Sequence, residues 1–354
     1  SLSHIFIIME TREEVYNTPG QHTTILTNLI RIGEYSSHAN LEVEPNGRNQ
    51  RYLVCVEKSF DPNFDLDDGI DKFIAKNPMD YENDLSHLQQ WAISERSELD
   101  NTYSEVFGEP EIVCCRGTLT DIAKTPYYGN DPWRVVAVRH DGIIYLHNCG
   151  ITDGNTFKPP LPNSPDAHFT YWGHNFHKIM TNSDPYLAHM GKFEDSKVVD
   201  CRETYCSIHR SDLIKPNGEV IKLAYASEIK AVNDYGDYID FKTHSSRVTD
   251  NFYLRKAWFW WIQSHFAGIN KIYTGIRNDQ GIVRKVQVLD MDFLRRRSEK
   301  RCDVVMNFLA TVLSEVKKRC VDTVQIRYSP DTRKVHFESA TRDTDFLIPN
   351  FVHY

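Results

Sequence analysis

The chain has 354 residues, of which 40% are hydrophobic and 25% charged, and its formal net charge is −8. These totals describe a globular protein that can bury a sizeable core, and no stretch reaches the ~18 apolar residues of a membrane-spanning helix. The negative net charge argues against binding nucleic acid through bulk electrostatics, but it does not exclude a local basic groove.

The cysteines indicate a reducing compartment. Eight of them are scattered without CxxC spacing, and Cys114 and Cys115 are adjacent. This pattern predicts reduced thiols in a cytosolic or nuclear protein rather than a disulfide framework. The chain begins at Ser1 without a charged-then-apolar leader, so we expect no secretory signal and a trimmed N-terminus.

Short strand patterns with turn signals alternate with a few helical patterns, which predicts an α/β (α+β) fold with mixed, largely antiparallel sheets. Strands are expected at residues 51–56, 111–117, 133–139, 143–147, 205–213, 219–232, 271–276, 282–288, 323–328 and 334–338. Helices are expected at residues 83–99, 171–180, 251–266 and 302–318. The proline-rich stretch 158–166 is expected to be a loop.

Residues 227–243 are predicted to form a β-hairpin, because two strand patterns flank a run of turn-forming residues. Side chains alternate along a strand, so Glu228 shares a face with Lys230, and Asp240 shares a face with Lys242. The two acids and two lysines are therefore expected to lie side by side. Two interpretations stay open: a solvated face with cross-strand ion pairs, or the floor of an active site or its remnant.

Two short segments contain groups suited to ligands. Arg116 can fork onto a phosphate and Gly117 permits a close backbone approach, although the same residues also suit an ordinary strand-to-turn passage. His174 and His177 stand three residues apart, which on a helix lets both face one metal ion. No cysteine or carboxylate with supporting spacing lies nearby, so we expect partly exposed histidines instead.

Two further runs have a structural and a functional interpretation. Residues 258–261 are aromatic, as in platforms that stack bases, but aromatics on all sides of a helix predict a buried core. The basic run 295–297 is expected at the solvated start of a helix, with phosphate contact as the alternative. The sequence contains no P-loop, dinucleotide-binding, GxSxG or HExxH motif.

Several of these pieces, taken in order, resemble the DXO family of RNA 5′-end decapping exoribonucleases. The resemblance runs from residue 29 to 337 and rests on DLDDGID (65–71), the helix ending at Trp91, CRGTLTDIAKTPY (115–127), GHNFH (173–177), YCSIHRS (205–211), SEIK…YIDFKT (227–243), WWIQS (260–264), GIRNDQG (275–281) and MNFLA (306–310). It implies one α/β domain over residues 1–354, with two sheets flanked by helices. It also implies a deep acidic pocket in which divalent cations catalyse hydrolysis at the RNA 5′ end.

The resemblance assigns roles to individual residues. The family's arginine that faces the RNA 5′ phosphate falls on Arg116, and its pocket glutamine falls on Gln263. Its Glu-apolar-Lys motif falls on the segment from Asp240 to Lys242, where the acid is shorter and the lysine is kept. The resemblance therefore implies that Arg116, Lys242 and Gln263 contact the RNA phosphate.

Two metal carboxylates of the family are replaced. The Gly-aromatic-x-Phe-Glu motif ends here in His177, and the Glu-apolar-Asp motif that begins at Glu228 ends in Lys230. An alternative register starting at Glu219 places Ile221 at the aspartate position, so this acid is lost either way. An ammonium about 4 Å from a divalent ion costs roughly 8 kcal/mol of repulsion at an effective dielectric of about 20.

We therefore expect a catalytically inactive relative, a pseudoenzyme, without a metal or other cofactor. Its vestigial pocket comprises His177, Glu228, Lys230, Asp240, Lys242 and Gln263. One alternative is an active RNA 5′-end pyrophosphohydrolase, decapping enzyme or 5′-to-3′ exoribonuclease with Mg²⁺ or Mn²⁺ at Glu228 and Asp240. Another is a scaffold that no longer binds RNA.

Degenerate family members include a piRNA-pathway protein of the fly germline, and similarity to such a member implies gene silencing in the nucleus. It implies binding of RNA 5′ ends and protection of nascent transcripts from 5′-end processing and transcription termination. It also implies protein partners of the Rhino and Deadlock type. No association with a membrane is expected.

Overall fold

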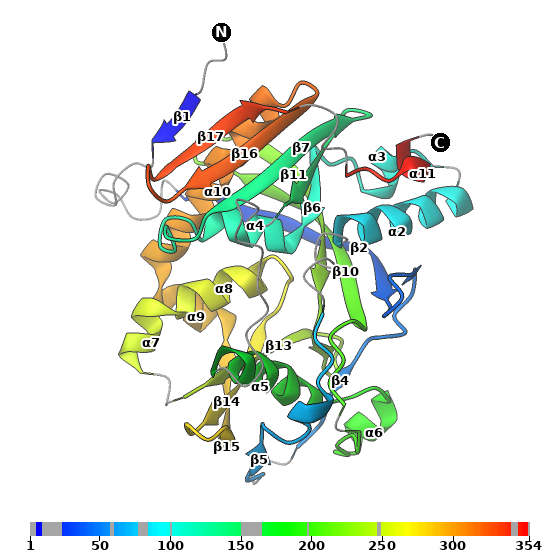
Figure 1. Ribbon diagram of the computed structural model, residues 1–354, viewed down its shortest axis with the longest axis vertical. Helices are drawn as coiled ribbons and strands as arrows, with labels where there is room; N and C mark the ends of the chain where they lie inside the picture. Colours follow the sequence, from blue (N-terminus) through cyan, green and yellow to red (C-terminus); the bar gives the residue numbers. More distant parts are fainter. Residues whose placement is uncertain are drawn as a thin grey trace.

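Two mixed β-sheets, one of ten strands and one of seven, carry the fold. In the computed structural model, the larger sheet lies in the upper part of the molecule and the smaller sheet in the lower part, with helices flanking both (Figure 1). The structure describes residues 5–8, 23–56, 60–76, 84–99, 101–149, 165–196, 198–245, 249–340 and 346–352. The predicted α/β class with mixed sheets is confirmed.

The strand order interleaves segments that are far apart in sequence. The larger sheet runs β1 (Ile5–Ile8), β17 (Lys334–Ser339), β16 (Thr323–Ser329), β7 (Trp133–His140), β8 (Ile143–Asn148), β6 (Ile112–Cys115), β11 (Val220–Glu228), β10 (Thr204–Ile214), β2 (Ile25–Ser37) and β3 (Val43–Glu44). The smaller sheet runs β5 (Phe64–Asp65), β15 (Ile282–Asp290), β14 (Lys271–Arg277), β13 (Tyr238–His244), β12 (Ala231–Val232), β4 (Tyr52–Leu53) and β9 (Thr181–Asn182). Most neighbouring strands in both sheets are antiparallel, as the sequence predicts.

The helices lie between and around the strands in the chain. They are η2 (Ile70–Lys72), α2 (Asp84–Leu99), α3 (Tyr103–Val106), α4 (Arg116–Ala123), α5 (Pro165–Ile179), α6 (Pro185–His189), α7 (Asp250–Arg255), α8 (Ala257–His265), α9 (Met291–Arg297), α10 (Glu299–Arg319) and α11 (Pro349–Val352). Within the described ranges, no helix combines the length and the apolar character that crossing a bilayer requires. The loop expected at residues 158–166 lies outside the described residues up to position 164, and α5 begins at Pro165.

The larger sheet is buried on both faces. In β7, Val135 and Ala137 belong to a core shared with α4, α8 and α10, whereas Val136 and Val138 belong to a second core shared with α2, α3 and α11. Because alternate residues of a strand face opposite sides of a sheet, this division places one group of helices on each face. The aromatic run 258–261 lies in or against the first core, which confirms the expectation of burial.

The structure corrects the expected strand at residues 111–117. β6 ends at Cys115 and α4 begins at Arg116. Leu119, Ile122 and Ala123 are buried in the first core, and their spacing of three and four residues is that of one helix face. Gly117 and two nearby threonines resemble a turn in the sequence and hide this pattern.

Three other expected segments differ from the structure. The helix expected at 251–266 is broken at Lys256 into α7 and α8. The basic run 295–297 forms the last turn of α9 rather than the start of a helix, where positive charge is favourable because it faces the carbonyl end of the helix dipole. The strand expected at 51–56 is reduced to Tyr52–Leu53.

Gly33 in β2 lies directly against the indole ring of Trp91 in α2. A Cβ atom at this position would lie 2.3 Å from Cζ2 of the buried Trp91. We expect Gly33→Ala to lower the free energy of unfolding by about 1–3 kcal/mol, because overpacking displaces well-packed side chains. Urea unfolding measures the change. Gly173→Ala in α5 is the matched control, since a Cβ there meets nothing within 4 Å, and an equal loss in both variants would contradict the packing argument.

Candidate functional site

The predicted hairpin is present, but its first arm belongs to both sheets. β12 pairs antiparallel with β13, with Ala231 opposite Ile239, and one further step in this register sets Lys230 opposite Asp240. Glu228 ends β11 in the larger sheet, whereas Ala231 begins β12 in the smaller one. The chain therefore crosses from one sheet to the other between these residues, and the candidate site lies at the junction.

The four charged side chains pair along each strand rather than across the hairpin. The Lys230 ammonium donates a hydrogen bond to the Glu228 carboxylate, and the Lys242 Nζ lies 3.2 Å from Oδ2 of Asp240. Each pair joins residues two positions apart, whose side chains lie on the same side of an extended chain. Of the two interpretations, the one with cross-strand ion pairs does not match the pairs formed here, although the two acids and two lysines do gather.

Electrostatics keep the Glu228–Lys230 pair charged. Burial raises the pKa of the Glu228 carboxyl, but the Lys230 ammonium outweighs burial, so the net pKa lies well below its usual value. Burial lowers the pKa of Lys230, but Glu228 outweighs this effect and the net pKa is raised. Asp240 adds to the increase for Lys230. Both partners are therefore ionised at neutral pH.

Glu228 and Lys230 line a cavity of about 310 Å³, together with His174 and His177 of α5. The other charged side chains of its lining are Arg48, Arg51, Lys76, Lys178, Asp200 and Glu203. Basic groups thus outnumber acidic ones, which is the reverse of the acidic pocket that the resemblance implies. Sequence reasoning missed these six residues because they come from separate segments and share no motif.

The replaced acid at position 177 is now a hydrogen-bond donor. Nε2 of His177 lies 2.7 Å from the main-chain oxygen of Lys230, so this nitrogen donates its proton to the carbonyl. Burial lowers the pKa of His177 well below its usual value, and the neighbouring Lys230 and Arg51 lower it further. The pKa of His174 is lowered to about 4, mainly by burial and then by Lys230. Both imidazoles are neutral at pH 7.

The lowered pKa values of these two histidines predict that the protein loses stability in acid. In the unfolded chain an imidazole takes up a proton near pH 6.5. In the folded protein the pKa of His174 is about 4, and the pKa of His177 also lies well below its usual value. The unfolded state therefore binds more protons between about pH 6.5 and 4, and stability falls as pH falls through this range. We expect His174→Gln combined with His177→Gln to flatten the decline in Tm between pH 7 and 5. An unchanged slope would contradict this assignment.

A second cluster contains the residues matched to RNA-phosphate contacts. Nη1 of Arg116 donates to the main-chain oxygen of Gln263 at 2.7 Å, and Nζ of Lys242 donates to Oε1 of Gln263 at 3.2 Å. Asp240 is buried, and Oδ2 of its carboxylate accepts from Oγ of Ser264 at 3.4 Å. Burial raises the pKa of Asp240, but Lys242 and then Arg116 outweigh it and lower the net value. The structure thus brings Arg116, Lys242 and Gln263 into contact.

Arg116 has an unused donor. Nε of this half-buried side chain is buried and has no hydrogen-bond partner among the described residues. Arg116 also begins α4, where Cys115 caps the helix without a side-chain hydrogen bond. A helix start presents main-chain N–H groups to an anion, and guanidinium groups bind phosphate in the same way. This corner of the site is suited to a phosphate.

The two acids of the site are paired with basic side chains rather than with each other. Hard cations such as Mg²⁺ need several oxygen ligands, but Glu228 and Asp240 each have an ammonium as partner. Across the described part of the chain, one group of three or more His, Cys, Asp or Glu side chains has ligand atoms within 4.8 Å of one another, and it consists of Cys55, His189 and Asp234. The pocket residues are not part of it.

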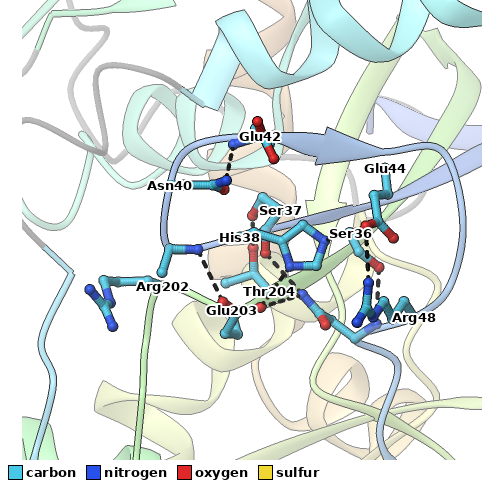
Figure 2. Close-up of polar contacts among 12 residues, drawn as sticks. Ser36, Ser37, His38, Asn40, Glu42, Glu44, Arg48, Arg202, Glu203 and Thr204 are labelled. Atoms are coloured by element: carbon cyan, nitrogen blue, oxygen red, sulfur yellow. Dashed lines mark hydrogen bonds and ion pairs between the residues drawn. The ribbon is translucent and has the colours of Figure 1, made fainter.

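A polar network joins several residues of the cavity lining to the neighbouring strands β2 and β3 (Figure 2). Oε2 of Glu203 accepts from Nδ1 of His38 at 2.8 Å and from Nδ2 of Asn49 at 3.1 Å. Nη1 of Arg48 donates to Oε1 of Glu44 in β3 at 3.1 Å, and Figure 2 shows this pair beside the loop that follows β3. Because Arg48, Asn49 and Glu203 also line the cavity, the network fixes polar groups in its wall.

Solved structures share this architecture, and curated relatives are similar to the chain in sequence. The decapping and exoribonuclease protein of Homo sapiens is 27% identical over 329 residues, covering 87% of this chain and 77% of that protein. The decapping nuclease dom-3 of Caenorhabditis elegans is 25% identical over 259 residues, covering 71% of this chain and 63% of that protein, less than two thirds of its length.

Rai1 of Scheffersomyces stipitis in complex with (3′-NADP)+ and calcium ion has a TM-score of 0.77 at 17% identity, covering 99% of this chain and 97% of that one. Rai1 of Candida albicans in complex with pU5-Mn²⁺ has a TM-score of 0.74 at 18% identity, covering 93% and 95%.

The structural likenesses confirm the mixed α/β fold with two mixed sheets. The family described as RAI1 like PD-(D/E)XK nuclease matches residues 30–352. The (D/E)XK part of that description means an aspartate or glutamate, any residue and then a lysine. This pattern occurs twice at the site, in residues 228–230 and in residues 240–242. Because the family match covers most of the sequence, the chain belongs to the RAI1-like PD-(D/E)XK nucleases.

Proposed function

We propose that this chain is a catalytically inactive member of its nuclease family that binds RNA 5′ ends in the nucleus. The observation that carries the proposal is the pairing of Glu228 with Lys230 and of Asp240 with Lys242. Metal-assisted hydrolysis of a phosphodiester needs carboxylates that are available to gather cations. Each ammonium instead occupies one side of a carboxylate and repels a divalent ion from it.

RNA binding rests on the basic groups of the two clusters. Arg116 and Lys242 both donate hydrogen bonds to Gln263, and Arg116 begins α4, whose first main-chain N–H groups can face an anion. The cavity next to them is lined by more basic than acidic side chains. The Candida albicans relative was crystallised with pU5-Mn²⁺, and we propose that this chain keeps the recognition of a phosphorylated RNA 5′ end without the metal.

The proposed cellular role follows from a resemblance to Cutoff, the fly germline protein that associates with Rhino and Deadlock at piRNA source loci. In that role the chain would protect nascent piRNA precursors from 5′-end processing and termination. Imaging of the tagged protein and co-precipitation with Rhino and Deadlock test this part. Exclusion from the nucleus would contradict it without affecting the proposed chemistry of the pocket.

The decisive experiment for inactivity is an RNA degradation assay. Purified protein is incubated with 5′-monophosphorylated or incompletely capped RNA in the presence of Mg²⁺ or Mn²⁺. We expect no cleavage above that of a Glu228→Gln, Asp240→Asn variant, because neither acid is available to a metal in the natural protein. Cleavage by the natural protein that disappears in the variant would overturn the proposal.

A second candidate function is an active, metal-dependent RNA 5′-end pyrophosphohydrolase, decapping enzyme or 5′-to-3′ exoribonuclease. Membership of a nuclease family and the retention of Glu228 and Asp240 favour it. For this function Lys230 would have to release Glu228 when Mg²⁺ or Mn²⁺ and RNA bind. The degradation assay separates the two candidates, since only this one predicts activity that depends on both acids.

A further inference from the structure

Three metal-binding side chains, those of Cys55, His189 and Asp234, come together beside the smaller sheet. None of them lines the cavity described above. β12 and β4 run parallel, with Val232 opposite Tyr52, and β4 pairs with β9 on its other side. Asp234 follows the end of β12 and Cys55 follows the end of β4. His189 ends α6, which follows β9. Because parallel neighbours end at the same edge of a sheet, Asp234 and Cys55 meet there. β9 is antiparallel to β4, and it is α6, after β9, that brings His189 to Asp234.

Their ligand atoms already stand close to the spacing of a coordination site. Oδ2 of Asp234 accepts from the Cys55 thiol at 3.1 Å and from Nδ1 of His189 at 2.8 Å. All three ligand atoms lie within 4.8 Å of one another. Ligands about 2.0–2.3 Å from a tetrahedral zinc ion are separated by roughly 3.3–3.8 Å. An ion therefore fits after a small outward movement of the side chains.

The backbone around the three residues is well anchored. The Cys55 main-chain N–H donates to the Ala188 carbonyl at 3.0 Å, which ties this segment to α6. Gly191 passes so close that a Cβ there would lie 2.7 Å from the Cys55 carbonyl oxygen. In the loop that contains Asp234, Oδ1 of Asn233 accepts from two main-chain N–H groups at 3.0 and 2.9 Å. These contacts hold the ligand-bearing segments together before an ion binds.

We propose that Cys55, His189 and Asp234 bind one divalent ion of the zinc type. Sulfur, imidazole and carboxylate are the ligands that zinc takes in proteins, whereas Mg²⁺ and Ca²⁺ take oxygen ligands. On binding, the thiol releases its proton to solvent, and the thiolate and carboxylate charges then balance the ion. The three side chains are exposed, so the ion has access from solvent and water fills the fourth position.

A bound ion would cross-link three segments of the chain that are distant in sequence. It joins the end of β4, the end of α6 and the loop between β12 and β13. Because the unfolded chain cannot bring Cys55, His189 and Asp234 together, an ion that binds the folded state raises its Tm. None of the three residues lines the cavity of the RNA-end pocket, so the proposal can be tested without reference to the proposed function.

Cobalt titration tests the site directly, because a thiolate bound to Co²⁺ gives a charge-transfer absorption band in the near ultraviolet. We expect this band to saturate at one ion per chain and to disappear when Zn²⁺ displaces Co²⁺. Cys55→Ser should abolish the band, and His189→Gln or Asp234→Asn should weaken the affinity at least about tenfold, since even indirect partners of a metal contribute this much. Cys149→Ser, which changes a half-buried thiol at the end of β8, is the matched control.

Two results would overturn the proposal. One is the absence of a thiolate charge-transfer band in the natural protein at saturating Co²⁺. The other is a band that survives Cys55→Ser or is lost in Cys149→Ser. Circular dichroism of each variant checks that it is folded, and a Zn²⁺-dependent increase in the Tm of the natural protein, absent from Cys55→Ser, supplies a second measurement.

Discussion

The double variant His177→Glu, Lys230→Asp is expected to bind Mn²⁺ at least about 100-fold more tightly than the natural protein. The change removes an ammonium and adds two carboxylates to the wall of the cavity, and hard cations prefer carboxylate oxygens. A 100-fold gain corresponds to about 2.7 kcal/mol. This is a small part of the roughly 8 kcal/mol repulsion between an ammonium and a divalent ion about 4 Å away at an effective dielectric of about 20.

Isothermal titration calorimetry or Mn²⁺ electron paramagnetic resonance measures this gain. The matched control is Lys285→Asp with Gln280→Glu, which makes the net charge more negative by the same amount at two exposed positions of the smaller sheet and its β14–β15 turn. The control should leave Mn²⁺ affinity within about twofold of the natural protein, because exposed charges are screened. Equal affinities of the natural protein and the double variant would show that Lys230 does not block the cation.

Arg116→Ala is expected to weaken binding of 5′-monophosphorylated RNA by about 10- to 100-fold. A hydrogen bond between charged groups contributes about 1.5–3 kcal/mol, and the family resemblance matches Arg116 to the arginine that faces the RNA 5′ phosphate. The substitution also removes the hydrogen bond to the main-chain oxygen of Gln263. Filter binding or fluorescence anisotropy gives the affinity.

Two controls assign this effect to the phosphate. RNA with a 5′-hydroxyl should bind the natural protein and Arg116→Ala almost equally, because it lacks the group that Arg116 contacts. Arg255→Ala changes an exposed arginine at the end of α7 and should leave both affinities unchanged. Loss of affinity for both RNAs in Arg116→Ala would point to a damaged pocket, and no loss for either would remove Arg116 from the phosphate site.

Local patterns predicted the parts of the fold whose residues are close in sequence. The hairpin of β7 and β8 follows from Asp141-Gly142, which adopts positive φ angles of 48° and 80° in the turn. The single apolar stripe of α10 likewise predicted a core helix, and its residues lie in the first core. α4 was missed because Gly117 and the threonines beside it weaken the helical pattern that Leu119 and Ile122 carry.

The candidate site was only partly accessible from the sequence. The resemblance brought Arg116, Gln263 and the hairpin acids to attention, and the structure places them in two adjacent clusters. It could not indicate that Lys230 pairs with Glu228 along the chain, because alternation fits both this pairing and a cross-strand one. The basic lining of the cavity also depends on tertiary structure, since it comes from loops and strands that carry no common motif.

The Glu228–Lys230 ion pair also makes the pocket difficult to reverse by single mutations. A change of Lys230 to aspartate alone would leave two carboxylates two positions apart without a counter-ion, and like charges at such a distance repel. A change of Glu228 first would leave the ammonium of Lys230 without its carboxylate. Either single change is expected to lower stability, and only the change of Lys230 is a step toward the family's set of acids. Each partner of the pair therefore limits which residues the other position can accept. As long as one partner is present, substitution of the other is disfavoured.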